Sequence, residues 1–195
     1  MTGKIITISR QFGSGGRTIG KLAARQLGLE CYDSEIIAEI AKKSGFDQNY
    51  IKENSEDTAE TGLFAALSGL DFYGHSNRDE IWTMQCRVIR ELAEKGPCVI
   101  VGRCADYVLK EDFDLLKVFI YADMEARARR IVEQYGESDE HPEKRLRDKD
   151  KRRAAYYEVY TDQKFGDYEN YDLCLCSSSI GIDKCAKIIR EVYQM

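Results

Sequence analysis

Residues 4–18 read KIITISRQFGSGGRT, and this stretch decides the fold. Its first part, residues 5–9, is apolar and rich in β-branched side chains, which predicts a buried β-strand. Glycines follow at positions 13, 15 and 16, and residues 18–27 have the pattern of a helix. Glycine allows positive φ angles, and the N–H groups at the start of a helix attract anions. The stretch therefore predicts a phosphate-binding turn between strand and helix. The alternative is a tight turn without a ligand.

We expect this turn to bind ATP with Mg²⁺ through Gly13, Ser14, Gly15, Gly16, Arg17 and Thr18. The consensus phosphate loop, G-x-x-x-x-G-K-[ST], has a lysine where this chain has Gly16 and a glycine where it has Arg10. Another cation must then supply the charge that phosphate transfer requires. The candidates are Arg10, Arg17 and Lys21, and Arg17 is the first choice because it opens the helix beside the turn. Thr18 is the expected Mg²⁺ ligand, together with the nucleotide's phosphates.

The rest of the chain alternates between short apolar runs and longer helical patterns. Strands are predicted over 98–102, 115–122 and 172–177, and helices over 79–95, 125–135 and 183–193. Such alternation predicts an α/β fold in three layers, with a parallel sheet between helices. The apolar runs have no polar alternation, as is typical of strands that are buried on both faces.

The chain has 195 residues, 43% of them hydrophobic, and we expect a single domain over 1–195. Two segments are more polar than the rest. Residues 44–77 are predicted to be a helical insertion that binds the acceptor, the second substrate, which receives the phosphate group. Residues 137–160 begin with an acidic, loop-like run and continue as an arginine-rich helix, which predicts a lid. A solvated charged face is the alternative for this second segment.

Composition and charge exclude several classes of function. A net charge of −5 argues against binding a nucleic acid polymer. The chain has no apolar run long enough to span a membrane and no signal-peptide pattern, so we expect no membrane partner and a cytoplasmic protein. The seven cysteines are an odd number and are scattered, which is typical of reduced thiols. A metal site at Cys174 and Cys176 is a remote alternative.

Five motifs are spread over nearly the whole chain: ITISRQFGSGGR at 6–17, YDS at 32–34, VGR at 101–103, DKRRAAYY at 150–157 and YDL at 171–173. Together they resemble the cytidylate kinase-like family, a divergent relative of bacterial cytidylate kinases among the P-loop nucleoside monophosphate kinases. The resemblance implies transfer of a phosphoryl group from ATP to CMP or dCMP.

The resemblance also implies roles for individual residues. Asp33, Ser34 and Arg103 would bind the acceptor nucleotide, as would Asp150 and Arg153 in an Asp-x-x-Arg element of the lid. Arg145, Arg147 and Arg152 surround this element as candidate phosphate clamps. The cations that we expect to act in catalysis are Arg17, Arg103, Arg147 and Arg153. The partners are then small nucleotides, and the oligomeric state is left open.

Several alternatives stay open at this stage. Asp33 has the pattern of a helix N-cap as well as that of a site residue. Arg127 and Arg130 are candidates for donor phosphates or for surface ion pairs. Cys104 stands where cytidylate kinases have the acidic residue that reads cytosine. A kinase for another small acceptor, or a nucleotide-binding regulatory module without turnover, is therefore also possible.

Overall fold

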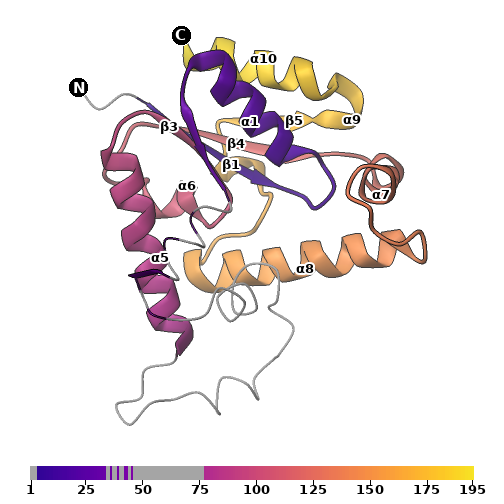
Figure 1. Ribbon diagram of the computed structural model, residues 1–195, viewed down its shortest axis with the longest axis horizontal. Coiled ribbons are helices and arrows are strands. Elements are labelled where there is room, and N and C mark those ends of the chain that lie inside the picture. Colours follow the sequence, from indigo (N-terminus) through magenta and orange to yellow (C-terminus); the bar gives the residue numbers. More distant parts are fainter. Residues whose placement is uncertain (1–3, 34–35, 37–38, 40–41, 44, 46–76) are drawn as a thin grey trace.

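A computed structural model describes residues 4–33, 36, 39, 42–43, 45 and 77–195 (Figure 1). Five parallel strands form one sheet in the order β2-β3-β1-β4-β5. Their bounds are β1 Ile5–Arg10, β2 Glu30–Tyr32, β3 Cys98–Val101, β4 Leu115–Tyr121 and β5 Leu173–Cys176. The predicted α/β class with a parallel sheet is thus confirmed. The insertion expected over 44–77 falls outside the described residues, apart from its residues 45 and 77, and so does Ser34.

The helices lie on both faces and at one end of the sheet (Figure 1). They are α1 Gly16–Leu27, α5 Asn77–Glu94, α6 Ala105–Val108, α7 Met124–Glu133, α8 Pro142–Thr161, α9 Ser177–Ile180 and α10 Ile182–Tyr193, with a 3-10 turn at Tyr168–Asn170. The four longer predicted helices are all found, and so is the charged helix expected within residues 137–160. Among the described residues, none of the helices has the length and apolar character needed to cross a membrane.

Strand β1 divides the core because alternate side chains face opposite sides of the sheet. Ile6 and Ile8 pack with α1 and α10, and this cluster includes Ile19 and Ile189. Ile5 faces the other layer, where α5 and α6 pack. All of these side chains are almost completely buried. The carboxyl end of β1 is therefore held rigidly at the centre of the sheet, and the glycine-rich turn begins there.

Candidate active site

The turn between β1 and α1 has the backbone conformation of an anion-binding loop. Gly13 and Gly15 have φ angles of +75° and +79°, and Gly15 is the N-cap of α1. Left-handed residues alternating with right-handed ones turn successive N–H groups toward a common concavity. The amino end of α1 adds its partial positive charge to the same place. A side chain at Gly15 would also collide with Ile182, whose Cδ1 lies 2.5 Å from the position of a Cβ atom.

The loop's carbonyl groups are bound by donors, most of which come from other elements. The carbonyls of Arg10, Phe12, Gly13 and Ser14 accept from Arg153 (3.2 Å), Arg127 (3.2 Å), Arg130 (2.8 Å) and Ser177 (2.5 Å), respectively. The Gln11 carbonyl accepts from the Ser14 hydroxyl at 2.9 Å. Donors on helices α7, α8 and α9 thus bind the carbonyl groups of the loop. The carbonyls of residues 10–14 are therefore all occupied.

Asp150 connects helix α8 to this loop. Its Oδ1 accepts the Phe12 N–H at 2.7 Å, and its Oδ2 pairs with Arg127. The Arg127 side chain is 5% exposed, so its charge is compensated inside the protein and not by water. Lys149 and Arg153 also lie over the Phe12 ring. In this conformation Asp150 is bound to the phosphate loop, although the family resemblance assigns it to the acceptor.

Arg17 is turned toward the end of β2. Its Nε lies 2.6 Å from Asp33 Oδ2 and its Nη2 donates to Asp33 Oδ1 at 3.1 Å, which is a two-point ion pair. Asp33 is buried, whereas 60% of the Arg17 side chain is exposed. The pair therefore links the first turn of α1 to the residue that follows β2. It brings together Arg17, which the sequence assigned to ATP, and Asp33, which the family resemblance assigned to the acceptor nucleotide.

Thr18 is exposed in the first turn of α1, beside the concavity. Within the described part of the chain, no group of three or more His, Cys, Asp or Glu side chains could hold a metal ion. Mg²⁺ generally keeps several waters and binds through one or two protein groups together with substrate phosphates. One hydroxyl beside a phosphate loop fits that mode of binding. All seven cysteines are free thiols.

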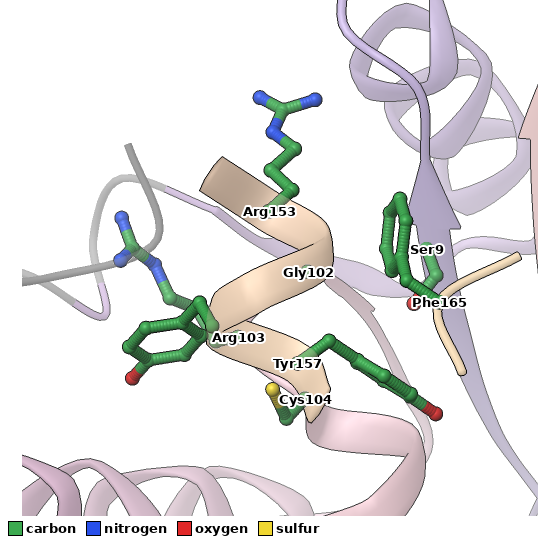
Figure 2. A pocket seen from close by; sticks show the side chains of 8 residues that line it. Ser9, Gly102, Arg103, Cys104, Arg153, Tyr157 and Phe165 are labelled. Atoms are coloured by element: carbon green, nitrogen blue, oxygen red, sulfur yellow. The ribbon is translucent and has the colours of Figure 1, made fainter. Parts of the chain in front are cut away.

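A second feature lies at the carboxyl ends of β1 and β3, where ligands bind in sheets of this kind. A small pocket there is lined by Ser9, Gly102, Arg103, Cys104, Arg153, Tyr156, Tyr157 and Phe165. Figure 2 shows the guanidinium groups of Arg103 and Arg153 in the upper part of the view, whereas the Tyr157 hydroxyl points to the opposite side. The pocket volume is about 10 Å³, the space of one water molecule. A nucleotide does not fit into this conformation.

The turn after β3 holds Arg103 in an unusual conformation. Arg103 and Cys104 have φ angles of +61° and +53°, which side chains other than glycine rarely adopt. Gln85, buried in α5, donates to the Arg103 carbonyl at 3.1 Å and accepts from the Tyr156 hydroxyl at 3.3 Å. Backbone strain that the surroundings impose in this way is common at functional sites. The arrangement aims Arg103 at the pocket.

Below this turn, Asp106 supports α6 from inside the core. It is 4% exposed and accepts the Tyr157 hydroxyl at 2.8 Å. Burial raises the pKa of Asp106, because the charged carboxylate loses hydration, and the Tyr157 hydrogen bond opposes this shift. Tyr160 stacks on Trp82 with a centroid distance of 4.3 Å. The tyrosines of α8 thus pack against α5 and α6.

The other lid arginines make local contacts. Arg147 pairs with Glu143 at 2.9 Å on the helix surface and is 62% exposed. Arg145 pairs with Glu137 at 3.0 Å and donates to the carbonyls of Ser138 and Glu140, which fastens the segment before α8. The structure thus places Arg103 and Arg153 at one pocket and leaves Arg147 on the outside of the lid helix. Arg127 and Arg130, which the sequence offered as ligands of donor phosphates or as surface ion pairs, donate to carbonyls of the loop, and Ser177, which the sequence did not single out, does the same.

The fold and the glycine loop define the class of this protein, a P-loop kinase fold. Shikimate kinase from Acinetobacter baumannii has a similar architecture, with a TM-score of 0.57 and 21% sequence identity over 99% of this chain and 94% of that chain. An uncharacterised protein from Eubacterium ventriosum is more similar, with a TM-score of 0.74 and 25% identity over 98% of both chains.

The model of the cytidylate kinase-like family matches residues 5–179, and the chain belongs to this family. A cytidylate kinase of Methanopyrus kandleri is 27% identical to it over 95% of this chain and 91% of the relative. The resemblance derived from the sequence motifs is therefore confirmed. Family and fold together support a phosphotransferase.

Proposed function

We propose that this protein is an ATP-dependent nucleoside monophosphate kinase that transfers the γ-phosphoryl group to CMP or dCMP. The observation that carries the proposal is the loop at residues 10–15, whose carbonyls are bound by their donors while two left-handed glycines shape the concavity. Membership of the cytidylate kinase-like family supports the acceptor class.

On the donor side, N–H groups of the loop and of the first turn of α1 bind the ATP phosphates. Thr18 is the protein group that would hold Mg²⁺, and the bound ion would neutralise charge on the phosphates. Fixed N–H dipoles act well here because they need no reorganisation as charge shifts during transfer. The loop's attachment to α7, α8 and α9 keeps them fixed.

On the acceptor side, Arg103 and Arg153, which both line the pocket, bind the acceptor phosphate. An ionised phosphate is already a nucleophile at neutral pH, so the residues must position it and not deprotonate it. Guanidinium groups suit this task because they form two parallel hydrogen bonds to phosphate oxygens. Because the pocket has room for about one water, it must widen before an acceptor enters.

A second candidate is transfer to another small phosphorylated acceptor. Cys104 is buried at the edge of the pocket, at the position where the resemblance leads us to expect the carboxylate that reads cytosine. A buried thiol is a weak hydrogen-bond donor and selects a base poorly. This observation favours an acceptor that is recognised mainly through its phosphate.

The test is ADP formation by purified protein with Mg²⁺-ATP and a panel of acceptors, including CMP, dCMP, the other nucleoside monophosphates and small phosphorylated metabolites. Turnover that depends on CMP or dCMP supports the proposal, and turnover with another acceptor supports the second candidate. ATP binding measured by calorimetry, with no turnover across the panel, contradicts both and leaves a nucleotide-binding regulatory module.

A further inference from the structure

The space in front of Gly16 is filled by the side chain of Arg10. A Cβ atom built on Gly16 would lie 2.7 Å from Arg10 Cβ and 3.0 Å from Arg10 Cγ. Both distances are too short for two carbon side chains to coexist. Arg10 is the last residue of β1 and pairs with Ile120 of β4, so its backbone cannot easily move aside. Residues 10 and 16 therefore compete for one side-chain position.

This competition explains both departures from the consensus loop at once. The consensus has glycine at its first position and lysine at its seventh. Here the first position is Arg10 and the seventh is Gly16. The cation therefore stands at the first position and the glycine at the seventh, the reverse of the consensus, and the two positions share one space. The loop has kept one positive side chain there, attached to the strand and not to the helix.

We infer that Arg10 is the phosphate-binding cation of this loop and takes the part that the lysine plays in the consensus sequence. This inference rests on the proposed function. The stem of Arg10 passes the first residue of α1, next to the N–H groups that bind phosphate. Its carbonyl is held by Arg153 Nη1 at 3.2 Å, which fixes the backbone from which the side chain departs. A guanidinium can bind two phosphate oxygens at once, which an ammonium group does less well.

Arg17, the cation favoured by sequence, has different surroundings. Its guanidinium makes a two-point pair with Asp33 at 2.6 and 3.1 Å, and 60% of its side chain is exposed. Binding a phosphate would require it to share or break this pair. The buried carboxylate of Asp33 would then lose a compensating charge, which is costly.

The decisive experiment moves the cation back to the helix. The variants are Arg10→Gly, Gly16→Lys, the exchange Arg10→Gly/Gly16→Lys, and the uncharged match Arg10→Gly/Gly16→Met, in which methionine fills the same space. Arg25→Ala, an exposed position in the last turn of α1, is the control for removing an arginine. For each variant, kcat with the best acceptor and the Kd of Mg²⁺-ATP are measured, and thermal unfolding checks the fold.

We expect Arg10→Gly to lower kcat by about 10²-fold or more, the usual effect of losing one charge-stabilising donor. Gly16→Lys alone should be as inactive, because its side chain collides with Arg10. The lysine exchange should recover at least about tenfold over Arg10→Gly, whereas the methionine exchange should recover stability without activity, because only the charge acts on the phosphates.

Wild-type kcat in Arg10→Gly, or equal kcat in the lysine and methionine exchanges, would overturn the inference and leave the proposed function standing. If the wild-type protein transfers phosphate to no acceptor, the proposed function fails, and the Kd of Mg²⁺-ATP decides the inference alone. Weaker binding in Arg10→Gly that the lysine exchange repairs and the methionine exchange does not would then support it. Equal Kd values across the series would contradict it.

Discussion

The donor side and the acceptor side of this site are built very differently. At the phosphate loop, donors from α7, α8 and α9 bind the backbone carbonyls, and two glycines adopt φ angles that suit an anion. At the proposed acceptor side, Arg103 and Arg153 line a pocket of about 10 Å³ beside α8. The loop on the donor side is held in place by these hydrogen bonds, whereas the pocket on the acceptor side must widen before a nucleotide can enter. ATP binding should therefore tolerate changes at the pocket but not changes in the loop.

The largest effect is expected at Gly15. In Gly15→Ala the new Cβ meets Ile182 at 2.5 Å in a left-handed conformation, so the loop must rearrange. We expect ATP affinity to fall by about 10²-fold or more, comparable to losing a key phosphate donor. Gly28→Ala is the matched control, because its φ is +69° but nothing lies within 4 Å of a Cβ atom.

Calorimetry with Mg²⁺-ATP measures both variants. Gly28→Ala should lose about 1 kcal/mol of stability through its left-handed conformation and bind ATP normally. If Gly15→Ala also binds ATP like the wild type, the loop is not the donor site.

The next effect is expected at Arg103. Arg103→Gly removes the guanidinium but relieves the backbone strain at φ +61°, so the fold is preserved. The KM for the acceptor should rise by about 10- to 100-fold, the cost of one charge-assisted phosphate contact. The KM for ATP should change little. Steady-state kinetics with each substrate varied separately checks this, and a parallel rise of both KM values would erase the distinction between the two sides.

The third effect, on stability and not on substrate binding, is expected where the two sides are joined. Asp150→Asn keeps an oxygen for the Phe12 N–H but leaves the charge of Arg127 uncompensated at 5% exposure. We expect a loss of about 2–3 kcal/mol in the free energy of unfolding, at the low end for a buried pair because Asp150 is 22% exposed. Urea unfolding measures it. The double variant Arg127→Met/Asp150→Asn should recover part of the loss, and additive losses would show that the two residues do not act together.

The smallest effect is a pH dependence below the acceptor pocket. Burial raises the pKa of Asp106 above its ordinary value of 3.8, so folding favours its protonated form. The stability that this contributes is complete below pH 3.8 and is lost as pH rises through the folded-state pKa.

Asp106→Asn removes the titration and keeps an acceptor for Tyr157. The free energy of unfolding of the wild type, relative to this variant, should fall as pH rises, by at most about 1.4 kcal/mol per pH unit. Urea unfolding from pH 4 to 8 checks this, and a difference that does not change with pH would contradict it.

The sequence was informative where local pattern is strong. The buried strands β1, β3 and β4 are apolar runs, and the glycine loop lies between the first of them and α1, as predicted. Strand β2 was missed because it has three residues, Glu30–Tyr32, and two of these are polar or amphipathic. Helices α6 and α9 have four residues each, too few to show a helical period.

The sequence named Arg127, Arg130 and Arg153 as candidates near phosphate, but their hydrogen bonds to the loop carbonyls could not be predicted, because the partners are far apart along the chain. Arg127 and Phe12 are 115 positions apart, and Ser177 and Ser14 are 163 apart. Nothing local marks these side chains as partners of the loop. Likewise, the competition between Arg10 and Gly16 depends on how closely β1 approaches α1. The sequence shows that both residues depart from the consensus. The fold shows that the two departures are linked, because the two side chains would occupy the same space.

The most direct measurement is a crystal structure of the protein with Mg²⁺ and a non-hydrolysable ATP analogue. We expect the β- and γ-phosphates within hydrogen-bonding distance of the loop N–H groups and of the Arg10 guanidinium, with Arg17 still paired to Asp33. Phosphates bound away from residues 13–18, or bound there by Arg17 with Arg10 turned away, would contradict this assignment.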